Sequence, residues 1–164
     1  MAALFGFVAN LFHPVTWENS DIKIWKDIKD KRVFTGPPSG AAAVTSEQMI
    51  RIITGYEPNK DYQAIRLPRG GGLQAMMDGK LDVYVRPAGL GATLIEQLGI
   101  KRRFRLLNAG DAASTDDWKK RYLSRSGRIT GVIPANTYQD QLGGDVVTGG
   151  GTFMMTVRKV LDAD

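Results

Sequence analysis

The sequence contains no cysteine, and among its 164 residues there is one histidine. The absence of cysteine excludes disulfides, thiolate metal sites and cysteine nucleophiles, but it leaves the cellular compartment open. The lone histidine, His13, is more typical of a surface residue or of a hydrogen-bonded structural residue than of a metal ligand or a base. Zinc chemistry and a Ser-His-Asp triad are therefore weakly supported, and we expect no catalytic residue, no metal site and no cofactor.

The chain also lacks a hydrophobic run long enough to cross a bilayer. Residues 1–12 are mostly apolar, but this stretch is too short to span a membrane. It has no basic region at its start and no clear small-residue cleavage site, so it does not have the pattern of a signal peptide. We expect a helix or a strand whose apolar face packs against another part of the protein.

Positive charge is in modest excess, with 22 lysines and arginines against 17 acidic residues and a net charge of +5. The densest basic run is Lys101-Arg102-Arg103, followed by Arg105, and it suits a solvated strand edge. A nucleic-acid surface would need stacking aromatic residues or a binding motif beside it, so we expect no nucleic-acid partner. The positive field favours an acidic ligand instead.

Strand and helix patterns alternate along the chain, which predicts an α/β fold with a largely parallel sheet. A hydrophobic content of 43% is enough for the core of one domain or of two small lobes. Strands are predicted at residues 15–17, 32–35, 62–67, 81–85, 104–107, 129–133, 146–148 and 153–157. Helices or helical turns are predicted at residues 25–29, 41–54, 73–78, 93–98 and 114–124.

Glycine is concentrated at three successive strand-to-helix junctions, residues 36–41, 68–72 and 86–91. In a parallel sheet these junctions lie at the carboxyl edge, where open α/β sheets bind ligands. The first N–H groups of a helix have no intrahelical partner, and small residues let an anion approach them closely. The candidate ligand-binding residues of these junctions are Ser39, Gly40, Ala41, Arg69, Gly71, Gly72, Arg86, Gly89 and Gly91.

Two of these candidates, Arg69 and Arg86, could pair bidentately with a carboxylate ligand. The alternative for each is a surface ion pair with the protein's own acids. Any single glycine-rich turn more often serves geometry or helix capping alone. None of the junctions matches the P-loop or the dinucleotide-binding fingerprint, so nucleotide hydrolysis is not expected.

Three segments resemble the TAXI-type solute receptors of TRAP transporters. Residues 20–33 followed by Gly36-Pro37-Pro38-Ser39-Gly40 are similar to the family's "I…DLKGKRV…G…SG" segment. Residues 76–83, Met-Met-Asp-Gly-Lys-Leu-Asp-Val, are similar to its "al-dG-iDa" helix and strand. Residues 133–138, Ile-Pro-Ala-Asn-Thr-Tyr, are similar to its "iPaGtY" motif. The resemblance covers residues 8–164 in order and spacing.

The resemblance implies a lobe of the type II periplasmic-binding fold, with solute in a cleft between two lobes. It implies a periplasmic receptor that binds a small organic acid or amino acid, delivers it to membrane permease subunits and does not act as an enzyme. The positions matching the family's binding turns are Ser39 to Ala41, the turn from Arg86 to Gly91, and Tyr138.

Family members are about twice as long and carry a signal peptide, so the resemblance implies a truncated chain. Residues 1–19 would be a crossover segment from a missing first lobe, residues 20–125 the ligand-binding lobe, and residues 126–164 a partial return into the first lobe. Loss of the first lobe would expose apolar surface, so self-association of the chain is expected.

Two other functions remain open at this point. A transferase on the same fold would need an acid–base pair in the cleft, and Asp82, Glu96 and Asp111 are the acids nearest the junctions. An effector-sensing domain of a transcriptional regulator would need a helix-turn-helix segment, and none is visible in the sequence.

Overall fold

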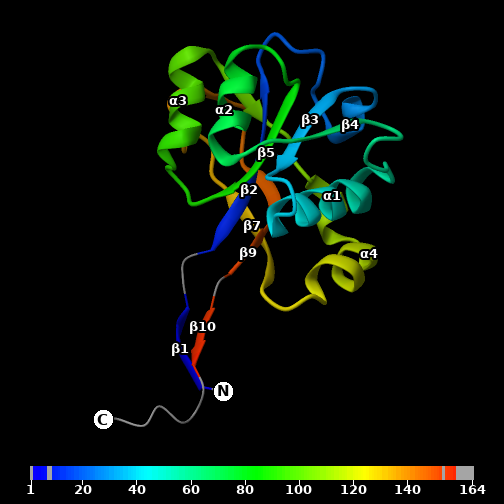
Figure 1. Ribbon diagram of the computed structural model, residues 1–164, viewed down its shortest axis with the longest axis vertical. Helices are drawn as coiled ribbons and strands as arrows, with labels where there is room; N and C mark the ends of the chain where they lie inside the picture. The colour runs from blue at the N-terminus through cyan, green and yellow to red at the C-terminus, as the bar shows by residue number, and fades with distance from the viewer. Residues whose placement is uncertain (1, 7–8, 153, 158–164) are drawn as a thin grey trace.

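Strands and helices alternate through the first two thirds of the chain, as the sequence predicts (Figure 1). The computed structural model describes residues 2–6, 9–152 and 154–157. The strands are β1 (Ala2–Gly6), β2 (Asn10–Trp17), β3 (Arg32–Gly36), β4 (Gln63–Arg66), β5 (Val83–Ala88), β6 (Phe104–Leu106), β7 (Arg128–Ile133), β8 (Gln141–Leu142), β9 (Val146–Gly151) and β10 (Met154–Val157). The helices are α1 (Ala41–Thr54), α2 (Arg69–Met77), α3 (Thr93–Lys101) and α4 (Asp116–Trp118), with short helical turns η1 (Trp25–Ile28), η2 (Gly110–Ser114) and η3 (Lys119–Leu123).

An 8-stranded sheet forms the centre of the protein, with the strand order β4-β3-β5-β2-β6-β8. β3 runs parallel to β4 and β5, and β6 runs parallel to β8. β2 runs antiparallel to its neighbours β5 and β6, so the other strands of this row all point the opposite way to β2. β9 pairs with the start of β2 and with β7. The predicted α/β class, with a mainly parallel sheet flanked by helices, is confirmed.

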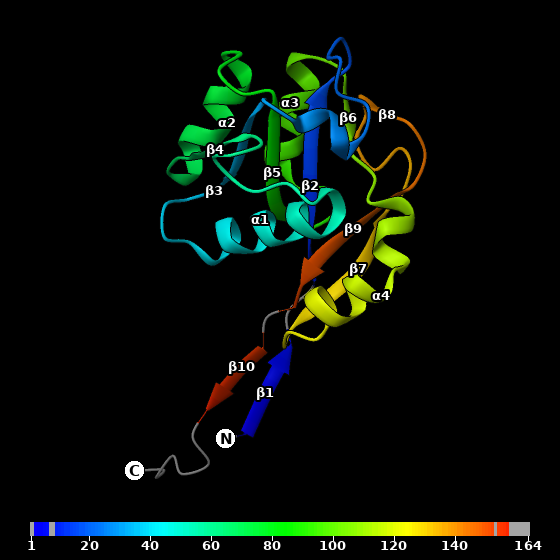
Figure 2. The same ribbon diagram turned by 90° about the vertical axis from the view of Figure 1, so that its right-hand side faces the viewer.

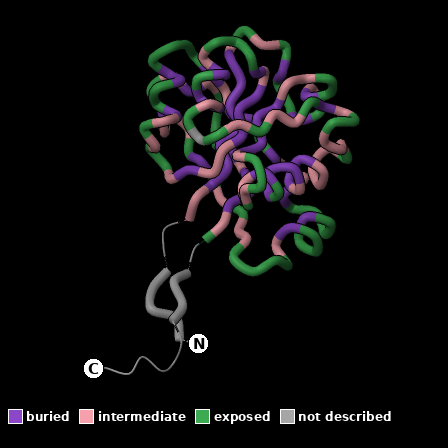
Figure 3. The backbone as a smooth tube through the Cα atoms, in the orientation of Figure 1, coloured by how far each residue is buried: buried purple, intermediate pink, exposed green. Residues whose placement is uncertain are grey.

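The two faces of the sheet carry separate hydrophobic clusters because side chains alternate along each strand. One cluster joins Leu11 and Val15 of β2 to Met76 of α2 and Ile95 of α3. The other joins Phe12 of β2 to α1, η1 and α4. Figure 1 shows α2 and α3 on one side of the sheet and α1 and α4 on the other, and Figure 3 shows burial concentrated in the strands between them. Each fully buried aliphatic side chain stabilises the folded state by about 1.5–3 kcal/mol relative to the same side chain exposed to water.

The helix predicted at residues 41–54 is confirmed with the same bounds as α1. Met49 and Ile50 are fully buried on its inner face. Gly55 ends the helix in the left-handed conformation, with φ of 82°, and its N–H donates to the carbonyl of Arg51. A Cβ-bearing residue disfavours this conformation, which is why glycine marks the end of the helix so well.

Two helix predictions need correction. α2 begins at Arg69 rather than at residue 73, so the run Gly70-Gly71-Gly72 is helical and not a turn. Glycine is a poor helix former, but a Cβ at Gly72 would lie 2.5 Å from the ring of Phe34, so packing against β3 requires glycine here. The helix predicted at residues 114–124 is divided into η2, α4 and the π-helical turn η3.

The predicted division of the chain after residues 19 and 125 stays a prediction, and segments on both sides of each position contribute strands to one sheet. β2 lies within the predicted crossover segment 1–19 and occupies the middle of the sheet, with Leu11 and Phe12 buried. β7, β8 and β9 lie within the predicted return segment and belong to the same sheet. β1 and β10 form an antiparallel ribbon that extends away from the sheet (Figure 2). Phe153, the first residue of the last predicted strand, lies outside the described residues. Among those residues, no helix is both long and apolar enough to cross a bilayer.

Candidate functional site

Two of the three predicted junctions meet at a pocket of about 530 Å³. β3 and β5 are parallel neighbours, with Phe34 opposite Tyr84, so the loops that follow them lie side by side. The first junction contributes Gly40 and Ala41, and the third contributes Arg86 and Gly89. The complete lining is Asn10, Phe34, Gly36, Pro37, Gly40, Ala41, Ala42, Val85, Arg86, Pro87, Ala88, Gly89, Ala92 and Leu94.

The wall formed by the first junction consists of backbone, because its residues are small. Gly36 has φ of 142°, and a Cβ there would lie 2.7 Å from the backbone nitrogen of Ala43. Gly40 is the N-cap of α1, and no side chain caps this end of the helix. The N–H of Ala43 donates to the carbonyl of Gly40, so the N–H groups of Ala41 and Ala42 are the ones without an intrahelical acceptor at the positive end of the helix dipole.

The one charged side chain in the lining of this pocket is Arg86, which is half-buried on β5. Its Nη1 donates to the hydroxyl oxygen of Tyr84 over 3.3 Å. Within the described residues no carboxylate forms an ion pair with Arg86, whereas two other arginines of this sheet have acidic partners: Arg32 pairs with Asp82 and Arg66 with Glu47. A guanidinium has the geometry to pair bidentately with a carboxylate or a similar anion, and such a contact by Arg86 stays a prediction.

Tyr138 is buried and contacts the third junction. The hydroxyl of Tyr138 lies 2.8 Å from Nε2 of His13 and 3.5 Å from the carbonyl oxygen of Gly89. His13 is fully buried, and its Nδ1 lies 2.9 Å from the carbonyl oxygen of Leu11. Burial lowers the pKa of His13 to about 4, against the opposing effect of the Leu11 hydrogen bond. The expectation that this histidine is a satisfied structural residue is therefore confirmed.

Other predicted site residues lie outside the pocket lining. Ser39 is exposed, with φ of 57°, one residue before the N-cap of α1. Gly91 adopts φ of 70° in the turn before α3. Gly71 and Gly72 lie in the first turn of α2, where Gly72 packs against the ring of Phe34. Arg69 begins α2, but its side chain lies outside the part that the structure describes. A ligand contact by these residues stays a prediction.

Six residues of the lining lie outside the predicted junctions: Asn10, Phe34, Ala42, Val85, Ala92 and Leu94. Asn10 reaches the pocket because β2 enters the sheet beside β5 in the antiparallel direction, which no local pattern indicates. Phe34 lies inside a predicted strand, and its position two residues before Gly36 is the only signal that it approaches the carboxyl edge.

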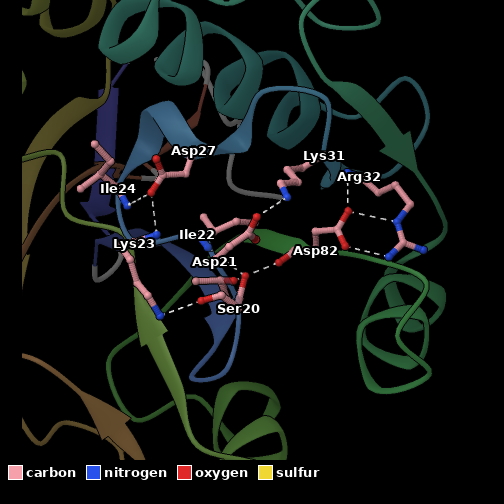
Figure 4. Close-up of polar contacts among 10 residues, drawn as sticks. Ser20, Asp21, Ile22, Lys23, Ile24, Asp27, Lys31, Arg32 and Asp82 are labelled. Atoms are coloured by element: carbon pink, nitrogen blue, oxygen red, sulfur yellow. Dashed lines mark hydrogen bonds and ion pairs between the residues drawn. The ribbon is translucent and has the colours of Figure 1, made fainter.

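The acids considered for a transferase do not line the pocket. Asp82 lies at the opposite edge of the sheet, just before β5, where its carboxylate accepts hydrogen bonds from the backbone N–H and the guanidinium of Arg32 (Figure 4). Burial raises the pKa of Asp82, but the hydrogen bonds and charge of Arg32 outweigh burial and hold that pKa below its usual value. Glu96 and Asp111 are also absent from the lining. An acid–base pair is therefore not assembled by the residues described around this pocket.

A second pocket, of about 470 Å³, lies between α1 and η3. It is lined mainly by polar and charged side chains on the helical surface: Val44, Glu47, Gln48, Arg51, Lys120, Arg121, Ser124 and Arg125. Its Arg51 and Arg121 already pair with Glu57 and Asp117, and its Glu47 accepts from Arg66. The pocket between the junctions is therefore the better candidate for a ligand site.

Comparison with known proteins supports the fold. A model of a family described as the NMT1-like family matches residues 1–164. The fold is similar to that of the periplasmic aliphatic sulphonate binding protein SsuA from Escherichia coli, with a TM-score of 0.50 and 17% sequence identity. The similarity covers 62% of this chain and only 33% of that chain, so the matched part spans about a third of the other protein's length. No curated protein matches the sequence. The predicted periplasmic-binding-protein-like lobe is confirmed, whereas neither match points to TAXI-type receptors in particular.

Proposed function

Because the chain belongs to the NMT1-like family, we propose that it is a lobe of an extracytoplasmic solute receptor which binds a small anion with an apolar body and performs no chemistry on it. The proposal includes delivery of the solute to membrane permease subunits and a periplasmic location. It also retains the idea that a second lobe closes the pocket, because a solute held by one wall alone is bound weakly.

The observation that carries the proposal is the position of Arg86. Its guanidinium lines the pocket together with Phe34 and Leu94, and no described carboxylate pairs with it. A partly desolvated cation gains most from an anion that brings charge-assisted hydrogen bonds. Ala41 and Ala42 at the start of α1 line the same pocket, and their N–H groups would be further donors for the anion.

The composition of the lining supports a ligand with two parts. The backbone of Gly40 and the guanidinium of Arg86 suit a charged head group, and the remaining wall is largely apolar. A carboxylate, as TAXI-type receptors would bind for TRAP transport, and a sulphonate, as in the name of the similar structure, both meet this description. The absence of an acidic side chain from the lining disfavours an ammonium group on the ligand, and so it favours a simple acid over an amino acid.

The test is a ligand panel measured by thermal shift and calorimetry. The panel contains 1-butanesulphonate, pentanoate, glutamate and, as an uncharged control, pentanamide. A ligand present at about 100 times its Kd stabilises the fold by about 2.7 kcal/mol, which raises Tm by about 5–10 °C in a domain of this size. We expect the two simple anions to raise Tm and the amide to leave it unchanged.

Arg86→Gln tests the site directly. Removing the cation from a buried charge pair costs about 2 kcal/mol or more, so Kd should rise by roughly 30-fold. Arg125→Gln is the matched control, because it removes the same charge from the other pocket and should leave Kd unchanged. Equal binding by Arg86→Gln and the unmodified chain, or no shift with any anion at millimolar concentration, would contradict the proposal.

A further inference from the structure

The cavity of about 470 Å³ between α1 and η3 has two walls, and each wall is one face of a helical segment. Residues three and four positions apart share a helical face, so the side chains of each wall lie on the same side of their segment. Figures 1 and 2 both show α1 beside the segment that begins with α4. One wall consists of Val44, Glu47, Gln48 and Arg51, and the other of Lys120, Arg121, Ser124 and Arg125.

Contacts between the two walls fix the shape of this cavity. Nε2 of Gln48 on α1 donates to the carbonyl oxygen of Arg121 over 2.7 Å. Arg128 of β7 joins the same two elements, because its Nη2 donates to the hydroxyl of Thr45 on α1 and its Cζ lies 5.8 Å from the ring centroid of Tyr122 in η3. Thr45 and Tyr122 are buried, so the cavity lies between packed parts of the fold.

Glu47, the one acid in this lining, presents no free charge to the cavity. It is 8% exposed, and both of its carboxylate oxygens accept hydrogen bonds from Arg66, at 2.9 and 2.8 Å. Its Oε1 also accepts from the hydroxyl of Thr35 over 2.9 Å. A carboxylate whose lone pairs are used in this way does not compete for the cations of the opposite wall.

Two cations of the opposite wall have no counter-charge. Lys120 and Arg125 are exposed, and neither forms an ion pair with any residue that the structure describes. Arg128 also has no acidic partner among those residues, and its buried Nε has no acceptor. The sequence has no acid at residues 118–139, so this segment supplies none. The cavity therefore lies in a positive field that the neighbouring side chains do not neutralise.

The composition of the walls favours a compact anion with several oxygens. Among the residues described around this cavity Val44 alone is apolar, whereas Phe34 and Leu94 give the pocket at the junctions an apolar wall. A phosphate group carries about 1.5 to 2 negative charges and several acceptor oxygens at pH 7, so it can contact a guanidinium and an ammonium group at once. The second N–H of the Gln48 amide adds a neutral donor.

We propose that this cavity binds a phosphate group between Lys120 and Arg125, with Gln48 as a further donor. The group belongs to a small phosphomonoester or to a phospholipid headgroup, two sources that share the same chemistry. This site is independent of the proposed function, because none of these three side chains lines the pocket at the junctions.

The test follows the binding of glycerol 3-phosphate by calorimetry and by ¹⁵N–¹H NMR. We expect saturable binding of one molecule per chain, with the side-chain amide of Gln48 and the backbone amides of residues 120–125 shifting along one binding curve. Lys120→Gln and Arg125→Gln should each raise Kd about fivefold, because each removes one cation from a partly exposed site. Both side chains are exposed, so the variants should keep the fold and the Tm of the unmodified chain.

Lys119→Gln is the matched control. Lys119 is exposed, belongs to the same segment and carries the same charge, but it pairs with Asp116 and lies outside the lining. This variant should leave the Kd for glycerol 3-phosphate unchanged, and so should Arg86→Gln, which weakens only the binding of the sulphonate. Equal losses in Lys119→Gln and Arg125→Gln, or no saturable binding of glycerol 3-phosphate, would overturn the proposal.

Co-sedimentation with vesicles of phosphatidylcholine, with and without phosphatidic acid, identifies the source of the phosphate group. Phosphatidic acid presents the same phosphomonoester at a membrane surface. Binding to these vesicles that glycerol 3-phosphate displaces, and that Arg125→Gln weakens more than Lys119→Gln, assigns the site to a lipid headgroup. Saturable binding of glycerol 3-phosphate without vesicle binding assigns it to a soluble phosphomonoester. Vesicle binding that glycerol 3-phosphate does not displace, and that both variants weaken equally, would reflect attraction between charged surfaces and would contradict a site in the cavity.

Discussion

Lowering the pH from 7 to 4 should destabilise this protein mainly through His13. The ring is buried and neutral, and burial lowers its pKa from 6.5 to about 4. Between these two values the unfolded chain binds a proton that the folded chain does not, so the free energy of unfolding falls as the pH falls. A difference of about 2.5 pH units corresponds to about 3 kcal/mol, of which about 2 kcal/mol is lost by pH 5. About one pH unit below 4 both states are protonated, and from there the contribution of His13 no longer changes.

The measurement is urea unfolding at half-unit pH steps from 7.5 to 4, with the unmodified chain compared with His13→Gln. The variant is expected to be less stable at pH 7, but its unfolding free energy should be nearly flat between pH 6.5 and pH 4.5. Asp21, Asp27 and Asp82 also have lowered pKa values, and they lose stability only as the pH approaches and passes below the usual 3.8. An equal pH dependence of both proteins above pH 4.5 would refute the assignment of the effect to His13.

Two further substitutions test the packing around the site and the core. Gly72→Ala should cost about 1–3 kcal/mol in chemical denaturation, because the new methyl group would lie 2.5 Å from the Phe34 ring, whereas Gly70→Ala meets nothing within 4 Å and should be neutral or stabilising. Thr130→Val removes the hydroxyl that accepts from Nε1 of the fully buried Trp118 over 2.8 Å. It should lower the free energy of unfolding by about 1–3 kcal/mol. An unchanged stability would mean that the indole finds another acceptor.

Much of the fold is accessible from the sequence, because local patterns specify its elements. α1 was predicted with its observed bounds, since apolar residues recur at helical spacing and Gly55 ends the run. The start of α2 was not predicted correctly, because three glycines in a row indicate a turn. The reason for glycine at position 72 is the neighbouring ring of Phe34, which is distant in the sequence. The antiparallel direction of β2 and the two-residue strand β8 depend on partners distant in the sequence, which periodicity cannot reveal.

Part of the candidate site could likewise be predicted from the sequence, and part could not. Gly40, Ala41, Arg86 and Gly89 were predicted from junction chemistry, and parallel strand pairing brings them to one pocket. Tyr138 was predicted as a ligand contact, and the structure places its hydroxyl against His13 beneath the turn. The partnership of Tyr138 and His13 joins residues that are 125 positions apart in the sequence. The entry of Asn10 depends on the pairing of β2 with β5, in which Leu11 lies opposite Ala88. The absence of an acid beside Arg86 is likewise a property of the folded chain.

The central position of β2 has a consequence for how the protein folds. On one edge of β2, residue 13 pairs with residue 86 of β5. At the start of β2, residue 11 pairs with residue 150 of β9. During synthesis β2 therefore emerges from the ribosome well before β5 and β9, the strands with which it pairs. Pairing over such separations makes folding slow and leaves an exposed, aggregation-prone strand in the interval. Chaperone protection of the nascent chain between the emergence of β2 and that of β9 would matter more here than in a fold whose early strands lie at the edge.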